Sequence, residues 1–209
     1  MWTAAILAGG QARRLGGRDK SALRVGDGSI LDRQLRVLRP LTPHILIVAG
    51  HGHTTPWPAI LQSEAGEDLR VVGDLIPGAG ALGGLYTALV EAPTEQVLVI
   101  ACDMPFVSAP FLSELAALGA DVDAAIPRDV HRRHPLCASY QRRIAAQLKM
   151  RIDAGALRIG DALCDLRVRD IDPDQVAPFD PDGLLLLNVN TPADYERARI
   201  AAAGEPPSA

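Results

Sequence analysis

Residues 3–20 read TAAILAGGQARRLGGRDK, and this stretch decides the fold. Residues 3–7 are a short apolar run of the kind that predicts a buried β-strand. Residues 7–20 then hold four glycines, four arginines or lysines and one acid. Glycines let backbone N–H groups approach an anion closely, while Arg14 and Lys20 can neutralise a polyphosphate. The stretch therefore predicts a strand that leads directly into a phosphate-binding loop, at the strand end where open α/β sheets bind ligands.

Two common phosphate motifs do not match this loop. A Walker loop requires Gly directly before the Lys-Ser pair, whereas Lys20 follows Asp19. The dinucleotide fingerprint GxGxxG cannot be aligned on the glycines present. The alternative is a glycine-rich surface turn with solvated arginines, but the many glycines and cations together favour an anion site.

Outward from this stretch, short apolar runs alternate with longer helical patterns, which indicates βαβ units around a mostly parallel sheet. The expected strands are residues 3–7, 44–49, 69–72, 96–101, 124–126, 136–140, 166–171 and 184–189. A Pro- and Gly-rich turn is expected at 77–84, and the expected helices are residues 31–38, 84–90, 109–118, 142–151, 156–163 and 192–202. With about 150 residues per domain as a guide, we expect one α/β domain over residues 1–203 and a frayed, disordered tail at 204–209.

The composition is that of a globular protein and excludes several classes. Hydrophobic residues make up 48% of the chain and charged residues 22%, which excludes wholesale disorder. The 21 Lys and Arg against 25 Asp and Glu give a net charge of −4, so no overall basic field favours nucleic acid as a partner. Three widely spaced cysteines favour a reducing cytoplasm over a disulfide framework. The apolar start lacks a basic leader and is broken by Gly9 and Gly10, so neither a signal peptide nor a membrane span is expected.

A second candidate site residue, Asp103, follows the clearest strand. Residues 97–106 read VLVIACDMPF, so the acid stands at the carboxyl end of a buried run. A carboxylate beside a triphosphate repels it unless a hard divalent cation lies between them, which makes Asp103 a candidate Mg²⁺ ligand. The alternative is an aspartate that only caps the loop. Cys102 fits the core better than a nucleophilic role.

Polar residues in two later segments are candidates for binding an acceptor. Residues 184–192 read LLLLNVNTP, and strand periodicity would place Asn188 and Asn190 on one face, where their amides could complete a metal shell or hold a ligand. Thr191 with the following proline is also an ordinary helix start. Residues 128–135 read RDVHRRHP, a basic loop that either receives an anionic acceptor or is simply solvated.

Taken in order, these segments resemble the molybdenum cofactor guanylyltransferase family, whose members join GMP to molybdopterin. The resemblance rests on residues 7–20, GAGALGGL at 78–85, ACDMPF at 101–106, HPL at 134–136 and NVNTPADY at 188–195. It implies a single-domain, Rossmann-like three-layer sandwich of the nucleotide-diphospho-sugar transferase type. The chain departs from the family's usual Gly-Pro-Leu-Ala-Gly by having GALGG at residues 80–84.

The resemblance also implies roles for individual residues. The nucleotide side would comprise Leu7, Ala8, Gly9, Gly10, Lys20, Asp74 and Asp103, with Asp103 binding Mg²⁺ as well. The catalytic residues would be Arg14, Lys20 and Asp103, and the acceptor side would comprise His134, Asn188 and Asn190. The implied partners are GTP, molybdopterin and the proteins that make the cofactor or deliver it to molybdoenzymes, with no nucleic acid or membrane partner.

The reaction implied is attack by the terminal phosphate of molybdopterin on the α-phosphorus of GTP, with release of pyrophosphate. The nearest alternative is a cytidylyltransferase or sugar-phosphate nucleotidyltransferase on the same scaffold. Residues 7–10 and the NVNTP segment resemble guanylyl-transferring members more closely. A third hypothesis is a nonenzymatic carrier that binds nucleotide and cofactor. A carrier, however, has no strong need for a carboxylate aimed at phosphates.

Overall fold

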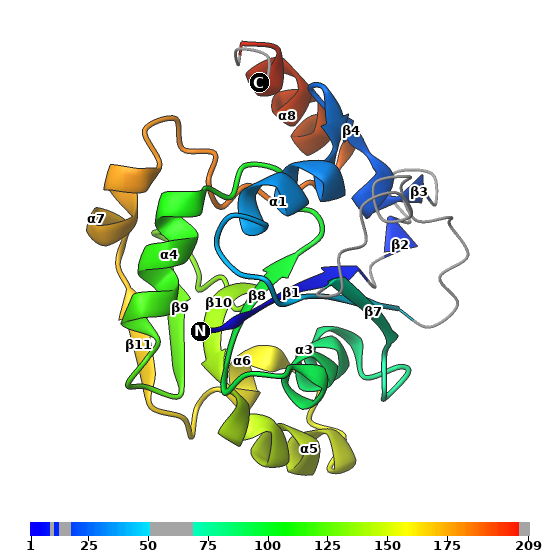
Figure 1. Cartoon of the computed structure of the whole chain (residues 1–209), viewed down its shortest axis with the longest axis vertical. Helices are drawn as coiled ribbons and strands as arrows, with labels where there is room; N and C mark the ends of the chain where they lie inside the picture. Colours follow the sequence, from blue (N-terminus) through cyan, green and yellow to red (C-terminus); the bar gives the residue numbers. More distant parts are fainter. Residues whose placement is uncertain (9–10, 13–17, 51–68, 205–209) are drawn as a thin grey trace.

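The computed structural model describes residues 1–8, 11–12, 18–50 and 69–204, with only the backbone at 11–12 and 18–20. Within these ranges, seven strands form one sheet in the order β11-β9-β10-β8-β1-β6-β7 (Figure 1). All neighbouring pairs are parallel except the two that β10 makes, with β8 and with β9. The strands are β1 (Thr3–Ala8), β6 (Ile45–Ala49), β7 (Leu69–Gly73), β8 (Gln96–Ala101), β9 (Ala124–Pro127), β10 (Cys137–Gln141) and β11 (Val168–Ile171). The predicted α/β class with a mostly parallel sheet is confirmed.

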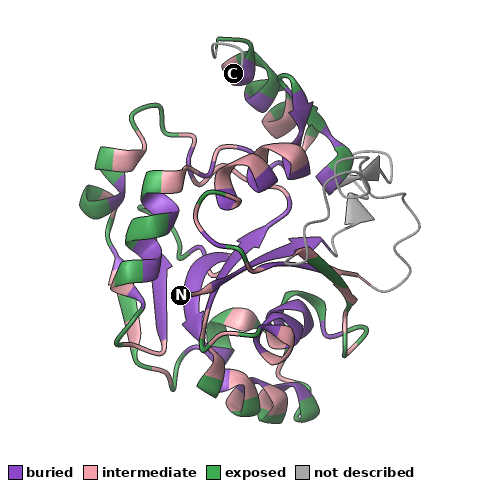
Figure 2. Ribbon diagram, viewed as in Figure 1, coloured by how far each residue is buried: buried purple, intermediate pink, exposed green. Residues whose placement is uncertain are grey.

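The central strands are buried on both faces, as Figure 2 shows. All six residues of β1 are buried, and β1 lies between β6 and β8. A strand covered on both faces has no solvent side, which is why its sequence is a continuous apolar run without alternation.

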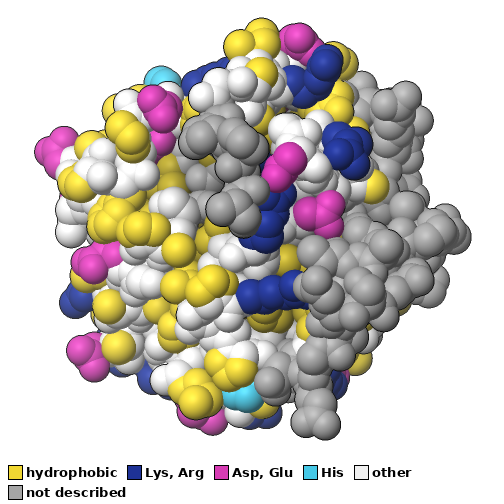
Figure 3. Space-filling model, turned by 45° about the horizontal axis from the view of Figure 1, so that its top comes forward, with side chains coloured by type: hydrophobic (Ala, Val, Ile, Leu, Met, Phe, Trp, Pro, Cys, Tyr) yellow, Lys and Arg dark blue, Asp and Glu magenta, His cyan; other side chains and the backbone are white. Residues whose placement is uncertain are grey.

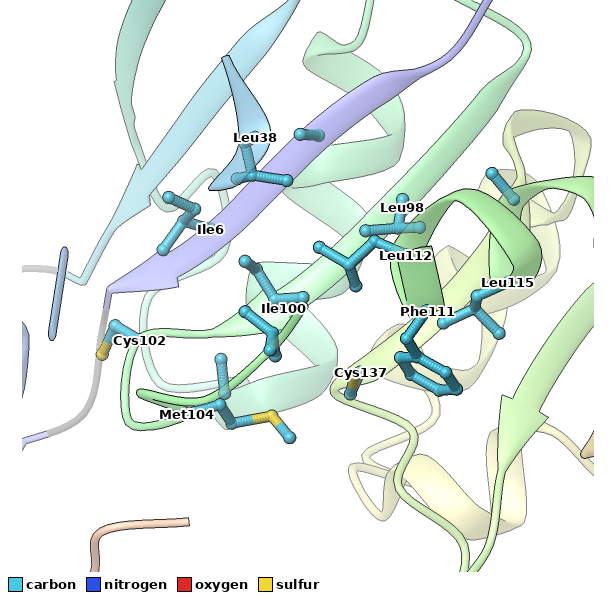
Figure 4. Close-up of a cluster of buried hydrophobic side chains, with 14 of the residues drawn as sticks. Ile6, Leu38, Leu98, Ile100, Cys102, Met104, Phe111, Leu112, Leu115 and Cys137 are labelled. Atoms are coloured by element: carbon cyan, nitrogen blue, oxygen red, sulfur yellow. The ribbon is translucent and has the colours of Figure 1, made fainter. Parts of the chain in front are cut away.

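Helices cover the two faces of the sheet and make three layers (Figure 1). On one face, α1 (Ile30–Leu38) and α4 (Ala109–Leu118) pack against the strands through an apolar cluster that includes Leu38, Phe111 and Leu112 (Figure 4). The other face carries α3 (Gly80–Glu91), α5 (Ala145–Asp153) and the short α6 (Ile159–Ala162), with a second apolar cluster beneath them. The predicted three-layer sandwich is confirmed.

Smaller elements flank this sandwich. Two short strand pairs follow β1, namely β2 (Gln11–Ala12) with β3 (Arg18–Asp19) and β4 (Arg24–Val25) with β5 (Gly28–Ser29). The other helices of the described residues are η2 (Lys20–Ala22), η3 (Arg142–Ile144), α7 (Pro173–Val176), η4 (Ala177–Phe179) and α8 (Pro192–Ala203). A third apolar cluster packs Leu23 and Val25 against Val189 and Ala198, so α8 lies beside the segment around β4.

The strand expected at residues 184–189 is absent, so this prediction is wrong. The Asp180 carboxylate accepts hydrogen bonds from the N–H groups of Leu184 and Leu185, at 2.7 and 2.9 Å. The Leu187 N–H donates to the Leu184 carbonyl at 2.9 Å, which closes a turn where a strand would need extended backbone. The helix expected at 156–163 shortens to α6, and α3 begins at Gly80, inside the expected turn.

Charge and hydropathy at the surface agree with the balanced composition. On the face drawn in Figure 3, the coloured basic side chains lie among acidic and apolar ones. None of the helices in the described ranges combines the length and the apolar character that a membrane crossing requires.

Candidate active site

The candidate site lies at the carboxyl edge of the parallel strands. Since β1, β6, β7 and β8 are parallel, their carboxyl ends share one edge of the sheet. The N–H of Cys102 donates to the carbonyl of Leu7 at 3.1 Å, which places the end of β8 beside the end of β1. Asp103 therefore follows β8 next to the point where the glycine-rich segment leaves Ala8.

Only part of the predicted nucleotide side falls within the described residues. Leu7 and Ala8 are the last two residues of β1. The backbone of Lys20 begins η2, but its side chain is outside the description. Gly9, Gly10 and Arg14 lie outside the described residues. Their roles stay predictions.

The Asp103 turn is held by its buried neighbours and by the segment before α8. Figure 4 shows Cys102 and Met104 among the buried side chains of the first cluster. The Met104 N–H donates to the Ala101 carbonyl at 3.3 Å and closes the turn. The Asp103 carbonyl accepts from the Val189 N–H at 2.8 Å, and its Oδ1 accepts from Asn188 Nδ2 at 2.8 Å. Asp103 and Asn188, 85 residues apart, are thus in direct contact.

A pocket of about 290 Å³ opens beside this contact. It brings together four of the predicted site residues, Asp103, His134, Asn188 and Asn190. The rest of its lining is Ala101, Met104, Arg132, Arg133, Pro135, Leu136 and Ile159. A second pocket of about 520 Å³ adjoins it and shares Arg132, His134, Asn188 and Asn190.

The two asparagines share a pocket for a different reason from the one predicted. Their segment is not a strand, so period-two alternation does not place them. Instead the Val189 N–H anchors the segment to Asp103, and the N–H groups of Asn190 and Thr191 donate to the Asp194 carboxylate. Thr191 is also the N-cap of α8, accepting from the Asp194 N–H at 3.1 Å, as its ordinary helix-start interpretation predicted.

His134 is buried and pairs with an acid of the basic loop. Its Nε2 lies 2.8 Å from Asp129 Oδ2, and the other oxygen of Asp129 accepts from the N–H groups of His131 and Arg132. Burial by itself would raise the pKa of Asp129, but these hydrogen bonds lower it to about 2. The carboxylate therefore stays ionised at neutral pH and fixes both the loop and the imidazole.

Asp74 lies at the same sheet edge but does not line either pocket in the described part of the chain. It follows β7, and its N–H donates to the Ala49 carbonyl at 2.9 Å. Its Oδ1 accepts from the Ile76 N–H at 3.0 Å and from Thr87 Oγ1 at 3.1 Å. This oxygen ties β7 to α3, and the contact of Asp74 with nucleotide stays a prediction.

Two residues around the site were not predicted from the sequence. In the sequence, Asp129 is one acid within a basic loop, and Gln34 of α1 belongs to no recognised motif. A signal for Gln34 is present, because it falls on the helix face that Leu31, Leu35 and Leu38 bury. A fully buried glutamine on an apolar face needs polar partners, and these are the carbonyls of the Asp103 turn.

Comparisons with known proteins agree with the predicted resemblance. The family model of the MobA-like NTP transferase domain matches residues 4–166. A probable molybdenum cofactor guanylyltransferase from Chloroflexus aggregans is 36% identical over 94% of this chain and 92% of its own length. The structure of molybdopterin-guanine dinucleotide biosynthesis protein A from Archaeoglobus fulgidus matches with a TM-score of 0.81 at 28% identity, over 98% of this chain and 100% of that one.

The same fold occurs in 2-C-methyl-D-erythritol 4-phosphate cytidylyltransferase from Thermus thermophilus, at a TM-score of 0.68 and 15% identity over 97% of this chain and 100% of that one. The fold alone therefore does not select a nucleobase. The family model, in contrast, spans β1, the Asp103 turn and the basic loop, and the Chloroflexus relative matches nearly the whole length. By sequence and by fold, this chain belongs to the MobA-like NTP transferase family.

Proposed function

We propose that this protein transfers GMP from GTP to the terminal phosphate of molybdopterin and releases pyrophosphate, which makes the guanine dinucleotide form of the cofactor. One observation carries the proposal. Asp103 follows Cys102, whose N–H binds the carbonyl of Leu7 near the end of β1, and it lines a pocket with His134, Asn188 and Asn190. The names of the Chloroflexus and Archaeoglobus relatives support the same reaction.

The residues present fit a magnesium ion bound mainly through its substrate. Within the described ranges, no group of three or more His, Cys, Asp or Glu side chains could enclose a metal. Mg²⁺ with nucleotides is commonly held by one or two carboxylates together with phosphate oxygens, and Asp103 supplies such a carboxylate. When bound, Mg²⁺ would offset the negative charge of the phosphates. We propose Asp103 as its protein ligand.

On the nucleotide side, the protein has to supply charge and position. The loop leaving Leu7 and Ala8, with Gly9 and Gly10, would cradle phosphates through its N–H groups. Arg14 and Lys20 would neutralise the charge that builds on the leaving pyrophosphate. Asp74 would complete the nucleotide site at the end of β7.

On the acceptor side, the terminal phosphate of molybdopterin needs positioning but no general base. A phosphate monoester has a second pKa of about 6 and is largely dianionic at neutral pH. His134, Asn188 and Asn190 would orient the acceptor, since their polar groups line both pockets. Of the loop arginines, Arg132 lines both pockets and makes a long hydrogen bond of 3.4 Å to Asn188, so it would receive the acceptor phosphate.

The test is pyrophosphate release by the purified protein with GTP, Mg²⁺ and molybdopterin. Asp103→Asn should lose about 2–4 kcal/mol of transition-state stabilisation, a rate lower by about 30- to 1000-fold. Asp121→Asn is the matched control, because exposed Asp121 precedes β9 and so lies at the opposite edge of the sheet. Asp103→Asn turning over at the rate of the unmodified protein would remove Asp103 from the mechanism.

The same assay separates the alternatives. Equal or faster release with CTP would favour a cytidylyltransferase, whose fold this chain shares. Binding of GTP and molybdopterin without any release of pyrophosphate would favour a carrier. We expect release with GTP and a rate with CTP at least 10-fold lower, since a site that hydrogen-bonds one base rejects another by such factors.

A further inference from the structure

The turn that carries Asp103 is held from below by one buried side chain of α1. Gln34 is 0% exposed, and its Nε2 donates to the Ala101 carbonyl at 2.8 Å and to the Met104 carbonyl at 3.0 Å. The two amide hydrogens therefore bridge the residues on either side of the Cys102-Asp103 pair. Gln34 is 67 and 70 residues from these partners, so the contact exists only in the folded protein.

The preceding residue of α1, Arg33, adds a further contact to the same segment. Arg33 Nε donates to the Pro105 carbonyl at 3.0 Å, and its guanidinium lies 5.2 Å from the centre of the Phe106 ring. The helix that presents both side chains is itself fixed at its start by a reciprocal capping box between Ser29 and Asp32. The carbonyl of Ala101 at the end of β8 and the carbonyls of Met104 and Pro105 after it are thus attached to one capped helix.

Stability alone does not favour glutamine at this position. Its Oε1 is buried and has no hydrogen-bond partner among the described residues. A buried acceptor without a partner costs free energy, whereas a methionine of similar size would fill the same space without that cost. The amide of Gln34 is explained instead by the two hydrogen bonds that its Nε2 donates to the turn.

We propose that Gln34 is a positioning residue that holds the 101–104 turn so that the Asp103 carboxylate faces the pocket in the orientation that nucleotide-bound Mg²⁺ requires. The proposal rests on the function proposed above. Gln34 acts through Asp103, because among the described residues the hydrogen bonds of its side chain go only to the turn. Groups that orient a metal ligand in this way typically change metal affinity by about 10- to 100-fold when removed.

The test compares Gln34→Met with the unmodified protein by calorimetric titration of GTP, with and without Mg²⁺ and in the absence of molybdopterin. We expect GTP affinity without Mg²⁺ to be unchanged, and the gain in affinity that Mg²⁺ produces to fall by about 10-fold. In turnover assays the Mg²⁺ concentration for half-maximal rate should rise by a similar factor. Gln34→Leu, which also removes the donor and stays apolar, should show the same change and serves if Gln34→Met does not fold.

Leu35→Ala is the control for a merely structural role. Leu35 is the neighbouring buried residue of α1 and packs in the same cluster without touching the turn by a hydrogen bond. Its truncation should lower the unfolding temperature and leave the Mg²⁺ dependence unchanged below that temperature. An equal change in Mg²⁺ dependence in Leu35→Ala and Gln34→Met would overturn the proposal.

A double variant separates this inference from the proposed function. If Gln34 acts through Asp103, adding Gln34→Met to Asp103→Asn should cause no further loss of the Mg²⁺ effect on GTP binding. Additive losses would overturn the positioning role. Loss of the effect in Asp103→Asn, with full retention in Gln34→Met, overturns the role of Gln34 and leaves the proposed function standing. Retention in Asp103→Asn overturns the metal role of Asp103 and with it the proposal for Gln34.

Discussion

Two adjacent arginines in the loop between β9 and β10 differ in what they bind. Arg133 forms a two-pronged ion pair with Asp170, with N···O distances of 2.5 and 2.6 Å. This pair ties the loop to β11 and occupies the guanidinium of Arg133. In the described part of the chain, the guanidinium of Arg132 has no carboxylate within 4.0 Å, and its one hydrogen bond there is the long one of 3.4 Å to Asn188 Oδ1. Among the described residues of this loop, Arg132 is therefore the arginine best able to bind an incoming phosphate.

Arg132→Ala should therefore raise the KM for molybdopterin by about 10-fold, or about 1.4 kcal/mol, because one charge-assisted hydrogen bond to phosphate is lost. Its unfolding midpoint should stay the same. Arg133→Ala is the matched control. It should lower the free energy of unfolding slightly, by the small contribution of an exposed ion pair. Its KM for molybdopterin should stay within about 2-fold of that of the unmodified protein. Steady-state kinetics and urea unfolding of both variants check this. Indistinguishable KM values in the two variants would contradict the assignment of the acceptor phosphate to Arg132.

Among the elements, α4 approaches the sheet closely at its last turn. Gly119 is the C-cap of α4, and a Cβ at this position would lie 2.7 Å from the Cβ of Ser139 on β10. Real Cβ atoms do not approach each other so closely. Ser139 cannot easily move away, because its Oγ accepts from Gln96 Nε2 at 2.9 Å. Glycine is required here for proximity between a helix and a strand, not for an unusual backbone angle.

Gly119→Ala should destabilise the protein by about 1–3 kcal/mol, the usual cost of forcing extra volume into a packed site. Gly160→Ala is the control with the opposite sign. Gly160 lies in α6 with nothing within 4 Å of an added Cβ, so alanine should stabilise by up to about 1 kcal/mol through helix propensity. Urea unfolding of the two variants measures both effects. A neutral Gly119→Ala would mean that α4 and β10 can separate freely.

The elements that could be predicted from sequence are those whose pattern reflects burial along their own length. The central strands and α1 are of this kind. Residues 184–189 are apolar for another reason, since Leu186 and Leu187 line the larger pocket while Leu185 enters the core. Elements of two to four residues, such as β4 and α7, are too short to show a period.

Placement in the candidate site could be predicted for residues that stand at strand ends, as Asp103 does. The contacts that support the site could not be predicted, because they join distant parts of the chain. Gln34 with the Asp103 turn, and Asp103 with Asn188, are pairs that only the fold creates. His134 was predicted to face the acceptor, but its pairing with Asp129 depends on the exact bend of the loop.

Several hydrogen-bonded aspartates make the free energy of unfolding depend on pH in the acidic range. Burial would raise the pKa values of Asp123, Asp129 and Asp194, but hydrogen bonds and nearby arginine or imidazole groups lower them instead. The hydrogen bond from Arg133 lowers the pKa of Asp170. A carboxylate whose pKa is lower in the folded state stabilises that state above its unfolded value of about 3.9, and this contribution is lost as pH falls further.

The free energy of unfolding should therefore change little between pH 7 and pH 5 on account of these groups and fall steeply from about pH 4 towards pH 2. Urea unfolding at a series of pH values measures this, and constant stability between pH 5 and pH 3 would contradict it. The same titrations test the proposal that residues 1–203 form one domain, since one domain of this kind unfolds in a single cooperative transition.

The third apolar cluster joins Leu23 and Val25 to Val189 and Ala198, which lie more than 160 residues later in the sequence. The Val189 N–H also reaches back to the carbonyl of Asp103. The pocket thus depends on residues far apart in the sequence, because Asn188 and Asn190 line it from the segment that this cluster docks. A fragment that stops before Asn188 would therefore lack one wall of the pocket, however well its sheet folds.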